Sequence, residues 1–172
     1  VAGTGTTAID FGPQTVSGVY TVVATNVSTG CTRTMGGSAS FTIDPLPPMF
    51  TLTGGGSYCS GDTGVNIGLA GSNAGVSYQL YRGISAIGSA VFGTGGPIEM
   101  GLQTVEGAYT IVATNSLTGC SSNMPGTANV SINPLPAVFT TTGGGHYCAG
   151  GTGVNISLSG SVTGIDYRLS ML

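Results

Sequence analysis

The sequence repeats itself at a spacing of 89 residues. Residues 20–26 return as residues 109–115 with one conservative change, and the Pro-Leu-Pro segment 45–47 returns unchanged as 134–136. A Thr-Gly-Gly-Gly run, followed one residue later by Tyr-Cys, recurs at the same spacing. Repeats of this kind build scaffolds and binding rods in which each unit contacts its neighbours. The repeat therefore favours a structural or binding role, and we predict that the protein is not an enzyme.

Neither end of the sequence falls at a repeat boundary. We assign residues 1–47 to the C-terminal part of one repeat, residues 48–136 to a complete repeat and residues 137–172 to the N-terminal part of the next. The boundaries follow the Pro-Leu-Pro segments because proline cannot donate to a sheet and stiffens a linker. Structural roles are predicted for Pro45, Pro47, Pro134 and Pro136. The open phase at both ends leads us to expect a longer array.

The composition indicates β-structure with an uncharged surface. Charged residues make up 5% of the chain, against about 25% in ordinary globular domains. No segment has a helical period, and the Gly-Gly-Gly run 54–56 is expected to break or bulge a strand. Seven short segments separated by Gly-rich turns predict an all-β fold with one antiparallel β-sandwich per repeat. These segments are residues 50–53, 65–69, 76–81, 90–92, 98–100, 109–113 and 128–132.

The four cysteines are the strongest candidate site in the sequence. Cys31 and Cys120 occupy one repeat position, and Cys59 and Cys148 occupy another. Regularly placed pairs in a lysine-free chain favour disulfides and an oxidising compartment. A zinc site fits poorly, because no CxxC motif occurs and the single His146 is not repeated.

The sequence is compatible with three disulfide arrangements. The favoured one joins Cys59 to Cys120 within a repeat and leaves Cys31 and Cys148 to partners outside the sequence. The second joins Cys31 to Cys59 and Cys120 to Cys148 across the Pro-Leu-Pro segments. The third attaches a loop of one domain to its neighbour. The first sits badly with standard immunoglobulin topology, which places its two cysteines at opposite ends of a sandwich.

The charges restrict the partners and the chemistry. A net charge of -3 gives little repulsion between molecules, so we expect self-association into a filament or bundle. The three arginines are too few to neutralise a run of phosphates, so no nucleic acid is expected. No apolar run approaches the roughly 18 residues of a membrane span, so no membrane insertion is expected.

Comparison of the repeat copies removes most candidate catalytic and metal sites. Asp10 recurs as Glu99, whereas the other acidic residues are not matched by acids. One acid per repeat cannot supply a calcium site alone, and no Ser-His-Asp set occurs in each repeat. We therefore predict no catalytic residue, no metal and no cofactor.

Residues 106–111 resemble the start of strand F in immunoglobulin-like domains. Tyr109, like Tyr20 in the preceding repeat, stands where that family has a tyrosine corner. Ile111 stands in place of the usual strand-F cysteine, and Leu80 in place of the strand-C tryptophan. The resemblance implies tandem immunoglobulin-like antiparallel β-sandwiches, closer to bacterial than to vertebrate repeats.

The order of three further motifs is more specific. Tyr-Cys-x-Gly precedes the second strand, Gly-x-Tyr-Thr-(Val/Ile)-Val-Ala-Thr-Asn follows, and Thr-Gly-Cys comes last. This arrangement resembles tandem repeats in giant secreted surface proteins of Bacteroidota, including gliding adhesins and the surface filaments of prey-grappling relatives. The resemblance implies an extracellular, cell-surface location.

The sequence thus predicts a structural or adhesive repeat of an extracellular filament or giant adhesin. One alternative is a module that binds surface glycans or other cells through exposed aromatic residues. A second alternative is a passive spacer for a distant enzyme domain. The candidate glycan-binding residues are Tyr58, Tyr78, Tyr81, Tyr147 and Tyr167.

Overall fold

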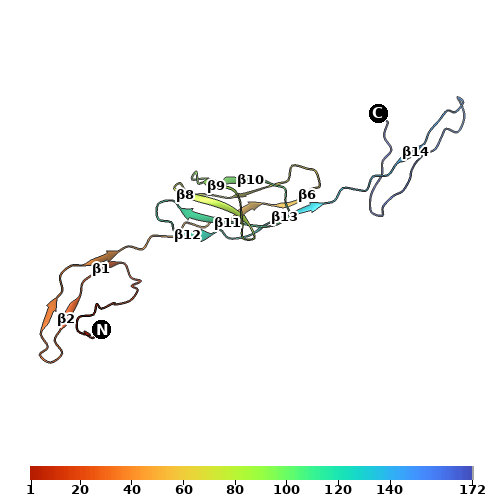
Figure 1. Ribbon diagram of the computed structural model, residues 1–172. Coiled ribbons are helices and arrows are strands. Elements are labelled where there is room, and N and C mark those ends of the chain that lie inside the picture. Colours follow the sequence, from red (N-terminus) through yellow and green to blue (C-terminus); the bar gives the residue numbers. More distant parts are fainter. Residues whose placement is uncertain (172) are drawn as a thin grey trace.

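The computed structural model describes residues 1–171 and confirms the all-β prediction. The described residues form strands, turns and loops and contain no helix. Figure 1 shows three parts in a row, with the N-terminus in the first, a compact sandwich in the middle and the C-terminus in the third. Only the middle part is built from two full sheets.

The central sandwich pairs a small antiparallel sheet with a larger mixed one. The small sheet has the order β10-β7-β5, and the larger sheet has the order β6-β13-β11-β8-β9, with β12 also pairing with β11. All pairs are antiparallel except β6 with β13. The strands are β5 (Leu52–Gly54), β6 (Gly56–Cys59), β7 (Val65–Leu69), β8 (Val76–Arg82), β9 (Ser85–Phe92), β10 (Ile98–Gln103), β11 (Gly107–Asn115), β12 (Ser121–Asn123) and β13 (Ala128–Asn133).

The core lies between these two sheets, and along β8 and β11 it is built by alternation of buried and half-buried residues. This alternation is expected where one face of a sheet packs on a core. No buried side-chain nitrogen or oxygen in residues 1–171 lacks a hydrogen-bond partner. Twelve apolar side chains form the buried cluster: Ile67, Leu69, Val76, Tyr78, Leu80, Ile98, Tyr109, Ile111, Ala113, Met124, Ala128 and Val130.

The Gly-Gly-Gly run transfers the chain from one sheet to the other. β5 ends at Gly54 in the small sheet, and β6 begins at Gly56 in the large sheet. Gly54 has φ 83° and lies directly against the backbone carbonyl of Asn66, where a Cβ atom would collide. A residue with a side chain is therefore strained here both by its backbone angle and by lack of space.

The first part contains two short ladders in the register of the central domain. β1 (Gly18–Tyr20) pairs with β4 (Ala39–Phe41), and β2 (Val23–Thr25) pairs with β3 (Thr32–Thr34). Each pair lies 89 residues before its counterpart in β11, β12 and β13, with the same partners opposite each other. The first part thus folds as the back of the same sandwich.

The third part contains the front of the sandwich. β14 (Thr141–Gly143) pairs with β15 (Ile156–Leu158) in the register that β5 makes with β7. Residues 165–171, the counterpart of β8, form no strand, although in the central domain β8 pairs with β11 over seven residues. The strand that would hold them belongs to the back half of a repeat.

The inter-repeat junction as the candidate functional site

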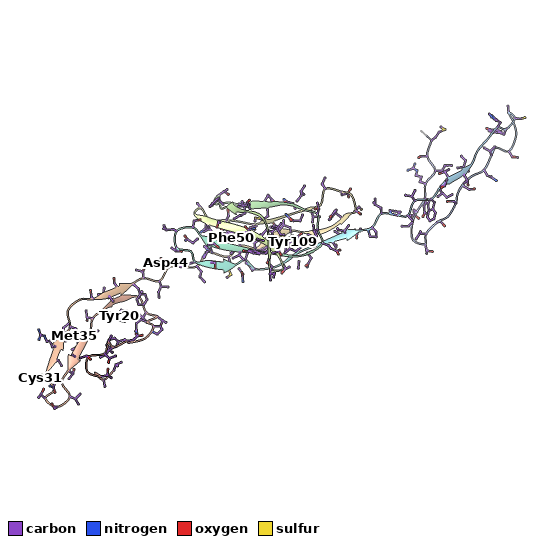
Figure 2. The ribbon with its side chains drawn as sticks, in the orientation of Figure 1. Tyr20, Cys31, Met35, Asp44, Phe50 and Tyr109 are labelled. Atoms are coloured by element: carbon purple, nitrogen blue, oxygen red, sulfur yellow. The ribbon has the colours of Figure 1, made fainter. Side chains whose placement is uncertain are left out.

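The linker that enters the central sandwich is held by the hairpin of β11 and β12. The Ser122 hydroxyl donates to the Pro47 carbonyl at 2.9 Å, and Pro47 is buried. The Cys120 Sγ lies 3.9 Å from the carbonyl oxygen of Asp44. Figure 2 places Asp44 at the step between the first part and the sandwich. This hairpin therefore fixes the linker at two points, on either side of Pro45 and Leu46.

A tight turn sets the position of Cys120. The side-chain oxygen of Asn115 accepts from the backbone N–H of Leu117 at 2.9 Å, and the Asn115 N–H donates to the Cys120 carbonyl at 2.9 Å. Such Asn turns replace backbone hydrogen bonds and hold a loop in one shape. Asn26 makes the same bonds to Ser28 and Cys31 in the first part. The recurring Asn and Thr-Gly-Cys were the sequence signal for this turn.

The second junction lacks such a hairpin. Pro134 and Pro136 are exposed, as is Pro45, whereas Pro47 is buried. The counterpart of the β11–β12 hairpin falls outside the front half of a repeat, so nothing in residues 137–171 can contact Pro136 as Ser122 contacts Pro47. The equivalent residues Pro47 and Pro136 therefore differ in burial because only Pro47 has a β11–β12 hairpin beside it.

The two candidate corner tyrosines make the same hydrogen bond. Tyr109 donates to the Val105 carbonyl at 2.7 Å, and Tyr20 donates to the Val16 carbonyl at 2.6 Å. This bond to the backbone four residues upstream is the contact of a tyrosine corner. Tyr109 is buried, whereas Tyr20 is half-buried and stacks on Phe41 at a centroid distance of 5.7 Å.

The four cysteines are unpaired, which corrects the favoured disulfide assignment. Cys59 pairs in register with Asn133 at the end of β13, whereas Cys120 lies beside Asp44 at the other end of the domain. A bridge within the repeat is therefore wrong, because the sandwich separates the two thiols. The bridges of the second arrangement, Cys31 to Cys59 and Cys120 to Cys148, are also not formed, and Figure 2 shows Cys31 at the far end of the first part.

Two candidate glycan-binding tyrosines of the complete repeat, Tyr58 and Tyr78, serve packing, whereas Tyr81 is half-buried on the outer side of the large sheet. Tyr78 is fully buried, and its hydroxyl accepts from the Asn73 N–H at 2.9 Å. Tyr58 is half-buried and donates to the Thr104 carbonyl across the sheets. Their counterparts Tyr167 and Tyr147 are exposed by 41% and 61%. Exposure at these positions therefore reflects the missing half of a repeat rather than a built binding surface.

Two open grooves occur in the flanking parts, and both are halves of a core. One, of about 930 Å³, is lined by Ile9, Tyr20, Val22 and Met35 among others. The other, of about 600 Å³, is lined by residues that include Ile156, Leu158, Tyr167 and Leu169. Each named residue has a buried counterpart 89 residues away in the central sandwich. The grooves fit the other half of the same domain.

Across residues 1–171, no three His, Cys, Asp or Glu side chains gather as a metal site would require. In the same range, no helix is long and apolar enough to cross a membrane.

Sequence comparison gives the chain no relatives: no protein-family model matches it, and neither does any curated protein.

Proposed function

We propose that this chain is a structural or adhesive repeat unit of an extracellular cell-surface filament or giant adhesin, and that it has no catalytic role. One observation carries the proposal. The chain holds one complete sandwich, joined in series to the back half and the front half of the same sandwich. Such a chain repeats one folding unit in series, as other repeat proteins do. The motif resemblance to surface repeats of Bacteroidota points in the same direction.

The strand order supports an immunoglobulin-like identity for each unit. In immunoglobulin lettering, the small sheet reads E-B-A and the large sheet reads A′-G-F-C-C′. The switch of the first strand at Gly54–Gly56 and the Tyr109 corner fit this lettering. The stretch between β9 and β10 has no strand D.

The junction supports an elongated shape. A proline-rich linker that is hydrogen-bonded to the next domain restricts bending between units. Proline fixes one backbone angle, and the β11–β12 hairpin contacts the linker at Asp44 and at Pro47. A filament or a long adhesin needs this property, since a flexible connection would let the units collapse on one another.

The outer face of the large sheet supports lateral self-association. Its half-buried side chains alternate with the core residues and lie opposite one another across β8 and β11. They carry no charge, so two such faces approach without electrostatic repulsion or desolvation of ions. We call this set the outer sheet face: Ser77, Gln79, Tyr81, Thr110, Val112 and Thr114.

The proposal is tested by following assembly as the concentration of the chain rises. Sedimentation velocity and negative-stain electron microscopy are expected to show ordered fibres or bundles. Val112→Lys places a charge in the outer sheet face and is expected to reduce lateral association strongly. Thr63→Lys adds the same charge at an exposed loop and serves as the matched control. A chain that stays monomeric and dispersed at every concentration contradicts the proposal.

A further inference from the structure

The two cysteines of a repeat lie beside the two ends of the domain, and each lies next to a linker residue. Cys59 ends β6 and stands opposite Asn133, the last residue before Pro134. Cys120 lies beside Asp44, the last residue before Pro45. The first cysteine therefore marks the exit of its domain, and the second marks the entrance.

Asp44 and Asn133 are the same position of the repeat, separated by 89 residues. The Asn133 carbonyl accepts from the Ser60 N–H at 2.9 Å, next to Cys59. The equivalent carbonyl of Asp44 has the Cys120 Sγ at 3.9 Å. Where one complete repeat follows another, the residue after one cysteine and the sulfur of the other cysteine therefore both lie at the same carbonyl oxygen. The first cysteine belongs to the domain that ends there, and the second belongs to the domain that begins there.

We propose that successive repeats are joined by a disulfide between the Cys59 position of one repeat and the Cys120 position of the next. We call this bond the junction staple. It rests on the proposed tandem array, because it needs two complete repeats in sequence. The staple adds a second covalent connection between neighbouring domains, besides the Pro-Leu-Pro linker.

The burial of the cysteines fits this assignment. Cys120 has a preceding linker in this chain and is half-buried against it, whereas Cys31, Cys59 and Cys148 are exposed. The partner position of Cys59 lies 89 residues after Cys120, beyond the 172 residues of the sequence. No two cysteines of residues 1–171 are related as the staple requires, and this accounts for four free thiols in a chain with two per repeat.

The chemistry is a thiol–disulfide exchange. Two cysteine thiols lose two protons and two electrons, and one S–S bond forms between the repeats. The oxidant is a small disulfide, such as oxidised glutathione, whose S–S bond breaks and takes up the electrons and protons as two thiols. A disulfide requires the Cα atoms of the two cysteines to lie within about 7 Å of each other.

The staple is tested in a two-repeat chain, in which a second copy of residues 48–89 precedes Val1 and completes the first repeat. The natural linker 44–48 then joins two whole sandwiches. One variant keeps only the added copy of Cys59 and Cys120, and all other cysteines are serine. The matched control keeps only the original Cys59 and Cys120, which belong to one repeat. Both are incubated with oxidised glutathione, and free thiols are titrated and peptides mapped.

The first variant is expected to lose both free thiols as a monomer, and the control is expected to keep both. In the two-repeat chain with all cysteines present, Cys120→Ser is expected to raise the number of free thiols by one, because it releases its partner. If both repeats of the first variant are folded and it keeps two free thiols, the staple is overturned, whereas the proposed tandem array is not contradicted. Equal oxidation of the control, or linkage between molecules, also overturns it. A first repeat that fails to fold contradicts both the array and the staple.

Discussion

The two flanking parts carry only the short-range strand pairings of the central sandwich, and only the central sandwich buries a core. Ile67, Leu80 and Ile111 are at most 1% exposed, whereas their counterparts Ile156, Leu169 and Val22 are 50%, 72% and 40% exposed. The short-range antiparallel pairings are present in all three parts. The comparison teaches that local pairing is encoded within each half, whereas burial needs both halves.

Three long-range ladders make the difference. β8 with β11, β7 with β10 and β6 with β13 each join the front of the repeat to its back. In the flanking parts one member of every such pair is absent. Since burial of apolar surface is the dominant stabilising term in folding, the cooperative stability of the chain is expected to reside in the central sandwich.

The largest expected contrast is between Leu80 and Leu169, the same leucine in the two environments. Leu80→Ala removes a buried side chain and is expected to lower the free energy of unfolding by about 2–5 kcal/mol. Leu169→Ala acts on an exposed side chain and is expected to change it by less than about 0.5 kcal/mol. Urea unfolding measures both, and equal losses would contradict the contrast.

Gly54 tests whether the switch between sheets needs glycine. Gly54→Ala places a Cβ against the Asn66 carbonyl at a positive φ and is expected to cost about 3 kcal/mol. Gly75 has a similar φ of 80° and open space around it, so Gly75→Ala is expected to cost about 1 kcal/mol. Thermal unfolding of the two variants separates collision from backbone strain. A Gly54→Ala protein as stable as Gly75→Ala would show that the strand switch tolerates a side chain.

The two tyrosine corners make the same hydrogen bond, one in the complete sandwich and one in the first part, which lacks a closed core. Tyr109→Phe removes the hydrogen bond to Val105 and is expected to destabilise the chain by about 1 kcal/mol. Tyr20→Phe removes the equivalent bond to Val16 from a part without a closed core. Its midpoint in urea is expected to match that of the wild type. A loss as large for Tyr20 as for Tyr109 would mean that the first part unfolds together with the sandwich.

The smallest expected effect concerns the hydrogen bond between Ser122 and the linker residue Pro47. Ser122→Ala removes the bond to the Pro47 carbonyl and is expected to cost less than about 1 kcal/mol. Its main effect is expected on the mobility of the linker. NMR relaxation of the backbone amides of Leu46 and Met49 is expected to show greater mobility, whereas the relaxation of the core amides is expected to stay unchanged. Unaltered relaxation would show that the hydroxyl does not restrain the linker.

Much of the central fold could be predicted from residue patterns. Alternation placed a strand at residues 65–69, where β7 lies, and predicted residues 76–81 and 109–113 within β8 and β11. β6 and β12 were missed because Gly-Ser-Tyr-Cys and Ser-Ser-Asn have no apolar alternation. Their pairing is set by distant partners on β13 and β11. Long-range context overrode local preference at these two strands.

The junction could be predicted only in outline. The recurring prolines indicated a linker, and the recurring Thr-Gly-Cys indicated a conserved turn within the repeat. The contact of Ser122 with Pro47 joins residues 75 positions apart, which no spacing pattern reveals. The favoured cysteine pairing failed because it was based on the number of thiols per repeat, whereas the standard immunoglobulin topology already placed the two cysteines at opposite ends of a sandwich, as the structure does.

The two-repeat chain, with residues 48–89 added before Val1, gives the most direct test of the central claim that the flanking parts are halves of one repeating sandwich. Its calorimetric enthalpy of unfolding is compared with that of the 172-residue chain. Unfolding enthalpy scales with the number of folded residues, at about 0.7 kcal/mol per residue near 60 °C. Completion of the first repeat is therefore expected to raise the enthalpy about twofold. An enthalpy equal to that of the 172-residue chain would contradict the claim.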